Sequence, residues 1–350
     1  MAPFRLLIYG FREDTLPSKV LIRGGGVAAL CCEHLLRRAG LHPIVETVDR
    51  PSVPAIMLTE STQKLLSDVF EGEDLFQGAS RIRNRVVAWG LNSAPLVVPH
   101  SAIVISEREL LDRIRRHLAP GERDEGAEID WTIFTSRPLP APTVDHHFGA
   151  RMAIAAAVKL KTTSNAETCW VESIEQGWLF LLPGGAGSAW LLSVGGRPES
   201  LLAVSRVVAE QIAEIGGSGG EFPCEPRITD PLCESGWLAC GTAVLGFDPL
   251  CGDGVGHAAR EAILGSAVVR AVAEGEDTKP VLAHYRTRLI AGMGRHLAVC
   301  REFYEAGRCG EWWDRELEST RRGLEWCARR IDNTSGFRYR LSGFALEAIT

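Results

Sequence analysis

The sequence contains no apolar run long enough to cross a bilayer and no excess of positive charge. A membrane helix needs about 20 consecutive apolar residues, and no stretch of the 350 residues meets that requirement. Lys and Arg number 38 against 44 Asp and Glu, which gives a formal net charge of -6 at pH 7. Such a chain offers no cationic surface for a phosphate backbone. We therefore expect neither a membrane span nor a nucleic-acid partner.

Cysteine is also sparse, and its spacing excludes two common uses. The ten cysteines are too few for a disulfide scaffold in a chain of this length, and no two of them form a C-x-x-C pair. We expect buried thiols and no metal site. The first residues, MAPFRLLIYGFREDTLP, lack the apolar core and the small-residue cleavage site of a secretory signal. The sequence thus favours a cytoplasmic protein.

The segment 18–46 has the pattern of a strand, an amphipathic helix and a second strand. Gly24, Gly26 and Ala29 fit G-x-G-x-x-A where the helix begins. The first glycine permits a tight turn, the second lets a pyrophosphate approach, and the small third residue lets helix and strand pack closely. The free N–H groups and the dipole of the helix start would then face the phosphates. This pattern predicts a dinucleotide-binding βαβ unit.

An acidic residue at the end of the second strand fits the same unit. Glu46 lies 22 residues after Gly24, where an acid usually binds the ribose hydroxyls of an adenosine. Because Glu46 falls one residue early relative to the glycine that ends the helix, Thr47 or Asp49 could take this role instead. The sequence leaves open which of these three residues binds the ribose hydroxyls.

A second glycine-rich segment spans 236–272. It has the pattern of a strand at 237–240, a loop DPLCGDG, and a long helix from about 255 to 273. Glycines at 252, 254 and 256 would let the backbone approach a flat ring, and N–H groups at the helix start would stabilise negative charge on that ring. A resemblance of this segment to flavin-binding proteins implies that the cofactor is bound here by Gly241, Thr242, Asp248, Pro249, Gly252, Gly254 and Val255.

This segment resembles the second flavin-binding segment of a group of FAD-dependent oxidoreductases. The group includes geranylgeranyl reductases, class A flavin monooxygenases and tryptophan halogenases, with a shortened LodB- and GoxB-like branch. In it a strand ends in Gly-Asp, followed by D-P-x-x-x-x-G and a helix under the flavin ring. The resemblance implies FAD as the cofactor. One departure is Gly241-Thr242 in place of Gly-Asp, which implies weaker retention of the ribitol because a hydroxyl binds less strongly than a carboxylate.

The resemblance also implies the fold class and the domain organisation. The expected fold is α/β, with a three-layer FAD-binding domain of the Rossmann-like, glutathione-reductase type, an interleaved antiparallel substrate sheet, and C-terminal helices. We assign residues 18–80, 101–136 and 225–280 to a discontinuous FAD-binding domain, 81–100 and 145–222 to the substrate-side sheet, and 281–350 to a C-terminal helical cap.

Local patterns place elements between and after the two glycine-rich segments. We expect a strand pair at 81–90 and 94–105, a helix at 106–118, a strand at 129–135 and antiparallel strands from 150 to 194. A helix at 201–215 and a flexible joint at 216–220 should follow. The joint formally matches G-x-S-x-G, but no strand precedes it, so we expect no nucleophile at Ser218. In the cap, Trp312 and Trp313 could line a substrate mouth.

The resemblance implies a monooxygenase. It would hydroxylate an aromatic substrate through a C4a-hydroperoxide formed from reduced flavin and O2. This substrate would be a small molecule or a group carried on a peptide, and tryptophan-derived groups are included. Electrons would come from a separate flavin reductase or a reduced nicotinamide. Tryptophan-type halogenases of this group use a lysine in the substrate-side region. Halogenation is disfavoured here because no lysine lies between Lys64 and Lys159. A flavin-dependent reductase or dehydrogenase of an alkene or lipid, a halogenase-like protein and a non-catalytic relative remain alternatives.

Three polar residues are the catalytic candidates: His257, Arg151 and His100. A histidine could act as a general base or hydrogen-bond donor, because its pKa lies near working pH. Cys251 should face the flavin ring. We expect it to serve in packing, since the sequence shows no basic neighbour that would activate its thiol.

Overall fold

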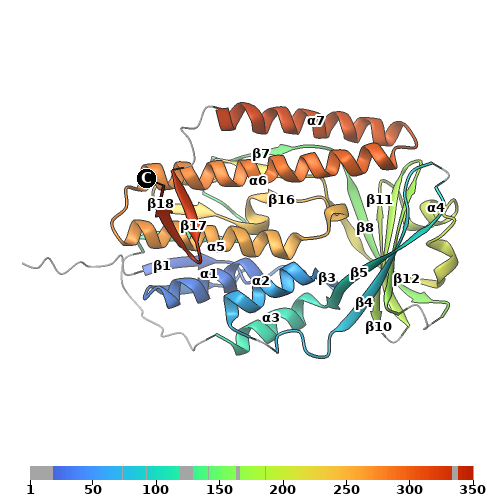
Figure 1. Cartoon of the computed structure of the whole chain (residues 1–350), viewed down its shortest axis with the longest axis horizontal. Coiled ribbons are helices and arrows are strands. Elements are labelled where there is room, and N and C mark those ends of the chain that lie inside the picture. The colour runs from blue at the N-terminus through green and yellow to red at the C-terminus, as the bar shows by residue number, and fades with distance from the viewer. Residues whose placement is uncertain are drawn as a thin grey trace, which may run out of the picture.

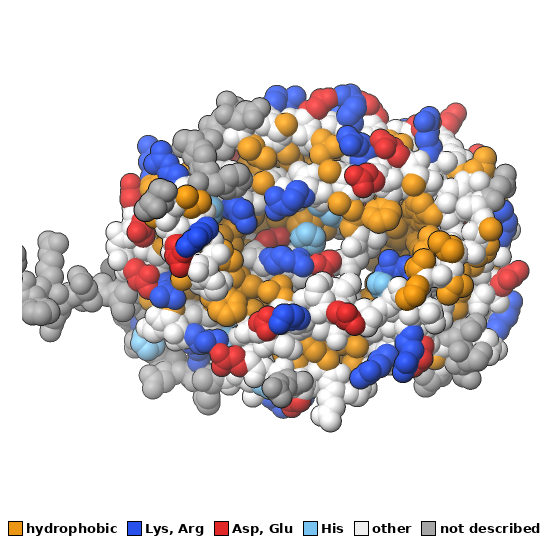
Figure 2. Space-filling model, in the orientation of Figure 1, with side chains coloured by type: hydrophobic (Ala, Val, Ile, Leu, Met, Phe, Trp, Pro, Cys, Tyr) orange, Lys and Arg blue, Asp and Glu red, His pale blue; other side chains and the backbone are white. Residues whose placement is uncertain are grey.

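The computed structural model describes residues 19–72, 74–91, 93–118, 129–140, 142–162, 166–185, 187–332 and 338–349. The N-terminal segment considered above as a signal lies outside these ranges. A small sheet with its helices occupies one half of the molecule and a large sheet the other half (Figure 1). In the described part of the chain, no helix is long and apolar enough to cross a membrane. Charged side chains of both signs alternate over the face in Figure 2.

The small sheet has five strands in the order β14-β15-β6-β1-β2. β1, β2, β6 and β15 run parallel, and β14 pairs antiparallel at the edge. The central strand β1 is buried along most of its length, as expected for a parallel strand covered on both faces. Its strands are β1 (Lys19–Arg23), β2 (His42–Glu46), β6 (Trp131–Phe134), β14 (Cys233–Glu234) and β15 (Trp237–Ala239).

Two helices with glycine-rich starts pack against this sheet and each other. The thiol of Cys32 in α1 lies 3.7 Å from the carbonyl oxygen of Ala262 in α5. The other two helices of this half begin at hydroxyl caps, since the side chains of Thr59 and Ser106 accept hydrogen bonds from N–H groups in their first turns. The helices are α1 (Val27–Arg38), α2 (Glu60–Phe70), α3 (Glu107–Arg116) and α5 (Gly254–Ala273). The βαβ unit and the helix near 106–118 are confirmed.

The large sheet has eight strands in the order β12-β8-β11-β10-β9-β4-β5-β3. All neighbours are antiparallel except β4 and β9. The predicted strand pair and the strands from 150 to 194 are therefore confirmed. The strands are β3 (Ile56–Thr59), β4 (Ser80–Ala88), β5 (Leu96–Ile105), β8 (Met152–Leu160), β9 (Thr168–Ile174), β10 (Gly177–Gly185), β11 (Ser188–Val194) and β12 (Ile212–Pro223).

Short elements lie between the longer strands and helices. A three-stranded sheet has the order β16-β13-β7; its strand β7 lies between β6 of the small sheet and β8 of the large sheet, and the other two strands follow β12. A short helix and a 3-10 turn lie between β11 and β12. These elements are β7 (Val144–His147), α4 (Pro198–Leu202), η2 (Ala209–Gln211), β13 (Arg227–Asp230), η3 (Gly241–Ala243), β16 (Leu245–Gly246) and η4 (Pro249–Cys251).

The chain ends in two long helices and a hairpin. α7 lies outermost, and α6 lies between it and α5 (Figure 1). The hairpin strands pair antiparallel beside α5. The elements are α6 (Thr278–Gly307), α7 (Glu311–Asp332), β17 (Tyr339–Ser342) and β18 (Ala345–Ala348).

The expected helix at 201–215 is wrong. Only residues 198–202 are α-helical, and turns that include the 3-10 turn η2 follow them. The carboxylate of Glu172 in β9 accepts hydrogen bonds from the backbone N–H groups of Arg206, Val207 and Val208. A helix would need those N–H groups for its own carbonyls, so the buried Glu172 holds the segment in a turn.

The expected flexible joint at 216–220 is also wrong. These residues lie inside β12, which pairs with β8 through three irregularities in register. Glycine suits such bulges because it has no side chain to clash. The backbone of Ser218 pairs with Ala156 in this strand. It is not a strand-to-helix turn, in agreement with the expectation that Ser218 is no nucleophile.

The expected domain division does not follow the strands. β5 runs unbroken from Leu96 to Ile105, so the expected division between residues 100 and 101 cuts through one strand. His100 therefore lies within this strand and not at its end. β3 likewise belongs to the large sheet although it precedes α2. The two halves of the molecule share these strands.

Candidate functional site

The first glycine turn has the geometry that its sequence requires. Gly24 has φ +138°, a conformation that L side chains rarely adopt, and a Cβ there would lie only 2.0 Å from Oγ1 of Thr135. Its N–H donates to the carbonyl of Glu46 at 2.8 Å. Gly26 is the N-cap of α1 and has an extended backbone. Ala29 is fully buried in the helix.

Charged side chains surround this turn. Glu46 is exposed at the end of β2, and its carboxylate pairs with Arg23 at 3.0 Å. Arg50 forms an ion pair with Glu107, and its guanidinium lies 3.0 Å from the position a Cβ would take on Gly26. The guanidinium therefore stands at the start of α1, where an anion would bind. Sequence reasoning missed Arg50, because only the fold brings it beside the turn.

The second glycine-rich loop surrounds the start of α5. Gly252 has φ +60°. A Cβ on Gly254 would meet no atom within 4 Å, so the backbone at this position is open to an approaching ligand. Gly256 differs from the expectation, since a Cβ there would collide with the carboxylate of Asp253. That carboxylate occupies the space beside Gly256 that was expected for the flat ring, and it accepts a hydrogen bond from the hydroxyl of Thr62 in α2.

Gly241 and Thr242 lie between the two glycine-bearing helices. A Cβ on Gly241 would lie 3.1 Å from Cβ of Ala28 in α1 and 4.0 Å from that of Ala258 in α5. The starts of both helices are thus separated by the width of one residue. The side chain of Thr242 is exposed, and its carbonyl accepts a hydrogen bond of 2.9 Å from Arg227.

A buried acid lies beneath this turn. Glu261 in α5 accepts a hydrogen bond of 2.7 Å from the N–H of Gly241. Burial raises the pKa of Glu261 to about 8, against smaller lowering effects of that hydrogen bond and of Arg260. The carboxyl group is therefore largely protonated near neutral pH.

Asp248 is held by a buried network behind the loop. Arg151 pairs with Asp248 at 3.3 Å and with Glu316 at 3.1 Å, and its side chain is completely buried. The hydroxyl of Tyr304 donates to Asp248 at 2.8 Å, and the guanidinium of Arg151 lies 4.3 Å from the centre of that ring. Asp248 also caps η4 by accepting from the N–H of Leu250.

This setting changes the role expected for Arg151. A fully buried guanidinium that pairs with two carboxylates and a hydroxyl exposes no surface to a substrate. It neutralises Asp248 and fixes the loop in place. We therefore regard Arg151 as a positioning residue.

His257 lies in the first turn of α5. Its ring stacks on that of Phe247 with centroids 3.9 Å apart and stands edge-on to His296 at 5.9 Å. Burial lowers the pKa of His257 from its usual value. The imidazole is therefore neutral at pH 7, in the form that a general base requires. Val255 precedes it on the same turn and is half-buried.

His100 lies on the large sheet with a charged partner. Arg85 in β4 donates to Nε2 of His100 at 3.0 Å and also bonds the thiol of Cys169. Burial and this guanidinium lower the pKa of His100. Cys169 belongs to a buried cluster that includes Met57, whose methyl group lies 3.9 Å from the position of a Cβ on Gly252. This apolar cluster connects the sheet to the loop at 248–254.

Sequence reasoning missed the groups that α6 brings to the loop. Cys251 has a basic neighbour after all, since His296 and Cys300 lie beside it. His296, Cys300 and Tyr304 are spaced four residues apart and so lie on one face of α6. This spacing was the available signal. It gave no indication of which loop the face would meet.

A cavity of about 530 Å³ opens on the large sheet, with Trp312 in its wall. Met152, Ile154 and Ala156 line it from alternate positions of β8. Ala153, which points the other way, packs in the cluster that holds Leu250. The cavity therefore lies on the sheet face turned away from the loop at 248–254. Trp313 is fully buried and lines no mouth.

The fold is that of the flavin-dependent halogenases and monooxygenases. Among solved structures, the halogenase CmlS aligns with a TM-score of 0.70 at 17% identity, over 91% of this chain and 72% of its own. QhpG, a peptidyl tryptophan dihydroxylase essential for tryptophylquinone cofactor biogenesis, gives 0.66 at 18%, over 85% and 78%. The p-nitrophenol 4-monooxygenase PnpA from Pseudomonas putida gives 0.65 at 14%, over 90% and 99%.

These likenesses confirm the expected fold class. No family model matches the chain, and no curated protein matches it in sequence. The identities below 20% mean that the shared property is the fold, and that substrate and reaction must be argued from the site.

Proposed function

We propose that the chain binds FAD and acts as a flavin-dependent monooxygenase on an aromatic substrate. The observation that carries the proposal is the meeting of two glycine-bearing helix starts at Gly241, with Ala28 of α1 on one side and Ala258 of α5 on the other. A helix start attracts anionic groups through its free N–H groups and dipole. Two such starts suit a ligand that has a pyrophosphate at one end and an electron-rich ring at the other.

The residues present fit FAD at each part of that ligand. Gly24 and Gly26 would hold the pyrophosphate at α1 with Arg50 beside them, and Glu46 would bind the ribose hydroxyls from β2. The exposed side chain of Thr242 would bind the ribitol. Open space above Gly254 would admit the ring. The remaining residues that we propose as the cofactor site are Ala29, Gly241, Asp248, Pro249, Gly252 and Val255.

Bound FAD would supply the activation of O2 after reduction by a separate flavin reductase or a reduced nicotinamide. The chain's own residues would orient the substrate and exclude water. Phe180 and Met57 belong to the apolar cluster on the sheet that reaches the loop at Gly252. His257 and His100, both neutral at pH 7, are the proposed groups that accept or donate a proton there. An apolar wall with two neutral imidazoles suits an aromatic substrate that bears a polar group.

The proposal is tested first by adding FAD to the purified chain, desalting it, and recording the visible spectrum. Retained flavin bands support the proposal. Reduced, FAD-loaded protein is then mixed with isotopically labelled O2 and candidate aromatic substrates, and mass spectrometry detects one labelled oxygen atom in the product. A chain that never binds FAD contradicts the proposal. So does flavin reoxidation that leaves all substrates unlabelled while an alkene is reduced or a halide is incorporated.

A further inference from the structure

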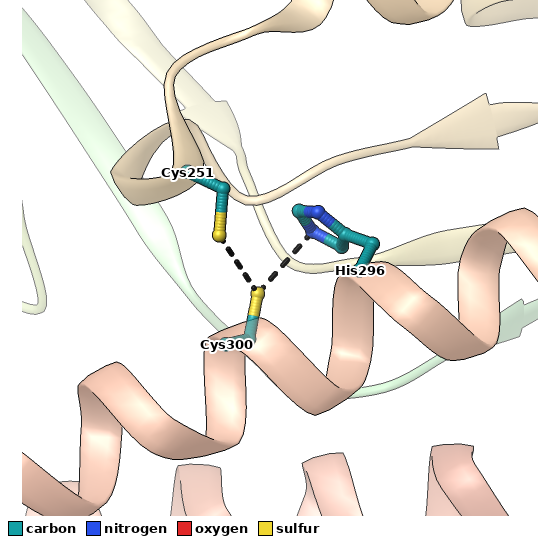
Figure 3. A group of neighbouring side chains, drawn as sticks. All are labelled: Cys251, His296 and Cys300. Atoms are coloured by element: carbon teal, nitrogen blue, oxygen red, sulfur yellow. Dashed lines mark hydrogen bonds between the residues drawn. The ribbon is translucent and has the colours of Figure 1, made fainter.

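Two cysteines and a histidine meet where the loop at 248–254 rests on α6. The sulfur atoms of Cys251 and Cys300 are 3.4 Å apart, and that of Cys300 lies 3.3 Å from Nε2 of His296 (Figure 3). Cys251 comes from η4, whereas the other two lie one turn apart on α6. Cys251 is half-buried and Cys300 is fully buried. Cys251 is therefore partly exposed, and its partner is protected.

The contacts make the two thiols unequal. The hydrogen bond with Cys300 and the proximity of His296 lower the pKa of Cys251 to about 6, against the opposing effects of burial and of Asp248. The hydrogen bond to Cys251 and burial raise the pKa of Cys300 well above its usual value. Arg151, on the far side of Asp248, acts in the opposite direction on Cys300. Near neutral pH the accessible sulfur is thus a thiolate, and the protected one keeps its proton.

The same three groups do not form a satisfactory metal site. Their donor atoms lie within 4.8 Å of one another. Nε2 of His296, however, already accepts a hydrogen bond of 2.9 Å from the backbone N–H of Asp248. A metal would need that lone pair and would leave the buried N–H without a partner. Structural zinc takes four protein ligands, and only three donors gather here among the residues that the structure describes.

We propose that Cys251 and Cys300 form a peroxide-oxidised thiol pair, in which Cys251 reacts with a hydroperoxide and Cys300 closes a disulfide. Redox-sensing cysteines combine an accessible thiolate with a neighbouring thiol in this way. The pair needs no bound flavin. It would respond to hydrogen peroxide from any source.

The chemistry proceeds in two balanced steps. The thiolate of Cys251 attacks one oxygen of hydrogen peroxide, so that an S–O bond forms, the O–O bond breaks, and hydroxide leaves and takes up a proton as water. Sulfur is oxidised to a sulfenic acid and the peroxide is reduced. The sulfur of Cys300 then attacks that of Cys251, the S–S bond forms, the S–O bond breaks, and the departing hydroxide takes the proton of Cys300 as a second water.

Disulfide formation would change the loop. A disulfide bond measures about 2.05 Å, whereas the two sulfur atoms now lie 3.4 Å apart. Closing that distance draws η4 toward α6 and tethers the proposed floor of the flavin site. The disulfide is therefore a regulatory modification of this loop.

The test is to treat the purified, reduced protein with about one equivalent of hydrogen peroxide, block the remaining thiols, and map peptides by mass spectrometry. We expect a single Cys251–Cys300 cross-linked peptide that dithiothreitol removes. In Cys300→Ser, Cys251 should stop at a sulfenic acid that dimedone traps. In Cys251→Ser, both products should disappear. Cys309→Ser is the matched control, because Cys309 is the other half-buried thiol, and it should behave as the native protein does.

Three outcomes would overturn the proposal. The first is oxidation at Cys309 or elsewhere before Cys251. The second is a sulfenic acid at Cys251 that persists while Cys300 is present. The third is a stoichiometric zinc ion in the purified protein whose removal is needed before either thiol reacts. Circular dichroism of each variant confirms that it has folded, so that a lost cross-link reports on the thiols.

Discussion

At the scale of the residue, the acid beneath Gly241 makes a specific prediction about pH. The folded protein raises the pKa of Glu261 to about 8 from an ordinary value of 4.5, so between these values the native state holds one more proton than the unfolded chain. The contribution of Glu261 to the free energy of unfolding is fully present below pH 4.5. It is lost as pH rises toward 8, at about 1.4 kcal/mol per pH unit. Glu261→Gln keeps an acceptor for the N–H of Gly241 and removes this titration.

The measurement is the free energy of unfolding in urea from pH 5 to pH 8.5 for both proteins. The free energy of unfolding of Glu261→Gln should increase steadily relative to that of the native protein as pH rises. The difference between the two free energies should level off above about pH 8. Buried histidines such as His257 titrate in both proteins and cancel in the comparison. Parallel curves would mean that Glu261 is not buried as described.

The first glycine turn allows the effect of space to be separated from that of backbone strain. Gly24→Ala should destabilise the fold, because it combines a positive φ with a Cβ only 2.0 Å from Oγ1 of Thr135. Gly40→Ala is the matched control, since Gly40 has φ +79° and open surroundings. Strain alone should cost the control about 1–2 kcal/mol, and Gly24→Ala should cost clearly more in urea unfolding. Equal losses would contradict the tight turn at Gly24.

At the scale of the element, the start of α5 predicts a loss of binding without a loss of stability. Gly254→Leu projects a side chain into the space that we assign to the flavin ring, where no atom lies within 4 Å of the added Cβ. FAD affinity should fall at least tenfold, while the melting temperature holds or rises, since glycine disfavours a helix. Gly217→Leu, at an equally open position in β12, should leave affinity unchanged. Fluorescence titration with FAD measures both, and equal affinities would contradict the placement of the ring.

Elements with a local cause were predictable from the sequence. The strand-turn-helix pattern around Gly24 and the helix that begins after Ser106 are set by residues close in the sequence, and both were expected correctly. The segment 201–215 shows where this reasoning fails. Its apolar spacing favours a helix, but its N–H groups bond Glu172, more than 30 residues earlier. A local pattern carries no information about such a partner.

The same limit applies to the site. The glycines of both helix starts were visible as motifs, because backbone geometry restricts those positions to small residues. Arg50, His296 and Cys300 were not, since they reach the site through contacts between distant segments that a single sequence does not specify. Arg151 was found as a polar residue, but its two buried partners come from other elements and changed its role.

At the scale of the whole molecule, one tryptophan joins the C-terminal helices to the large sheet. The ring of Trp313 in α7 is fully buried, and its N–H donates to the carbonyl of Ile174 in β9 at 2.8 Å. It also packs against Trp89, after β4, and against Tyr304 in α6. The C-terminal helices and the large sheet are therefore expected to unfold together.

Trp313→Ala should cost about 3–5 kcal/mol, because it removes a large buried side chain and leaves a cavity. The half-buried neighbour offers a control, and Trp312→Ala should cost less. Urea unfolding is followed by near- and far-ultraviolet circular dichroism, whose transitions should coincide in the native protein. Two separate transitions in the native protein would show that the C-terminal helices and the large sheet unfold independently.

The ion pairs behind Asp248 have a consequence for the energetics of recognition. Arg151, Tyr304 and the N–H of Leu250 all hold Asp248 from the interior, so the outward surface of the loop is preorganised before any ligand arrives. A ligand that settles on such a surface orders few additional torsion angles, and the entropic penalty of association is small. The buried guanidinium of Arg151, which lies behind the proposed site, thereby raises the affinity for the ligand, because it keeps the unliganded protein in the conformation that binds.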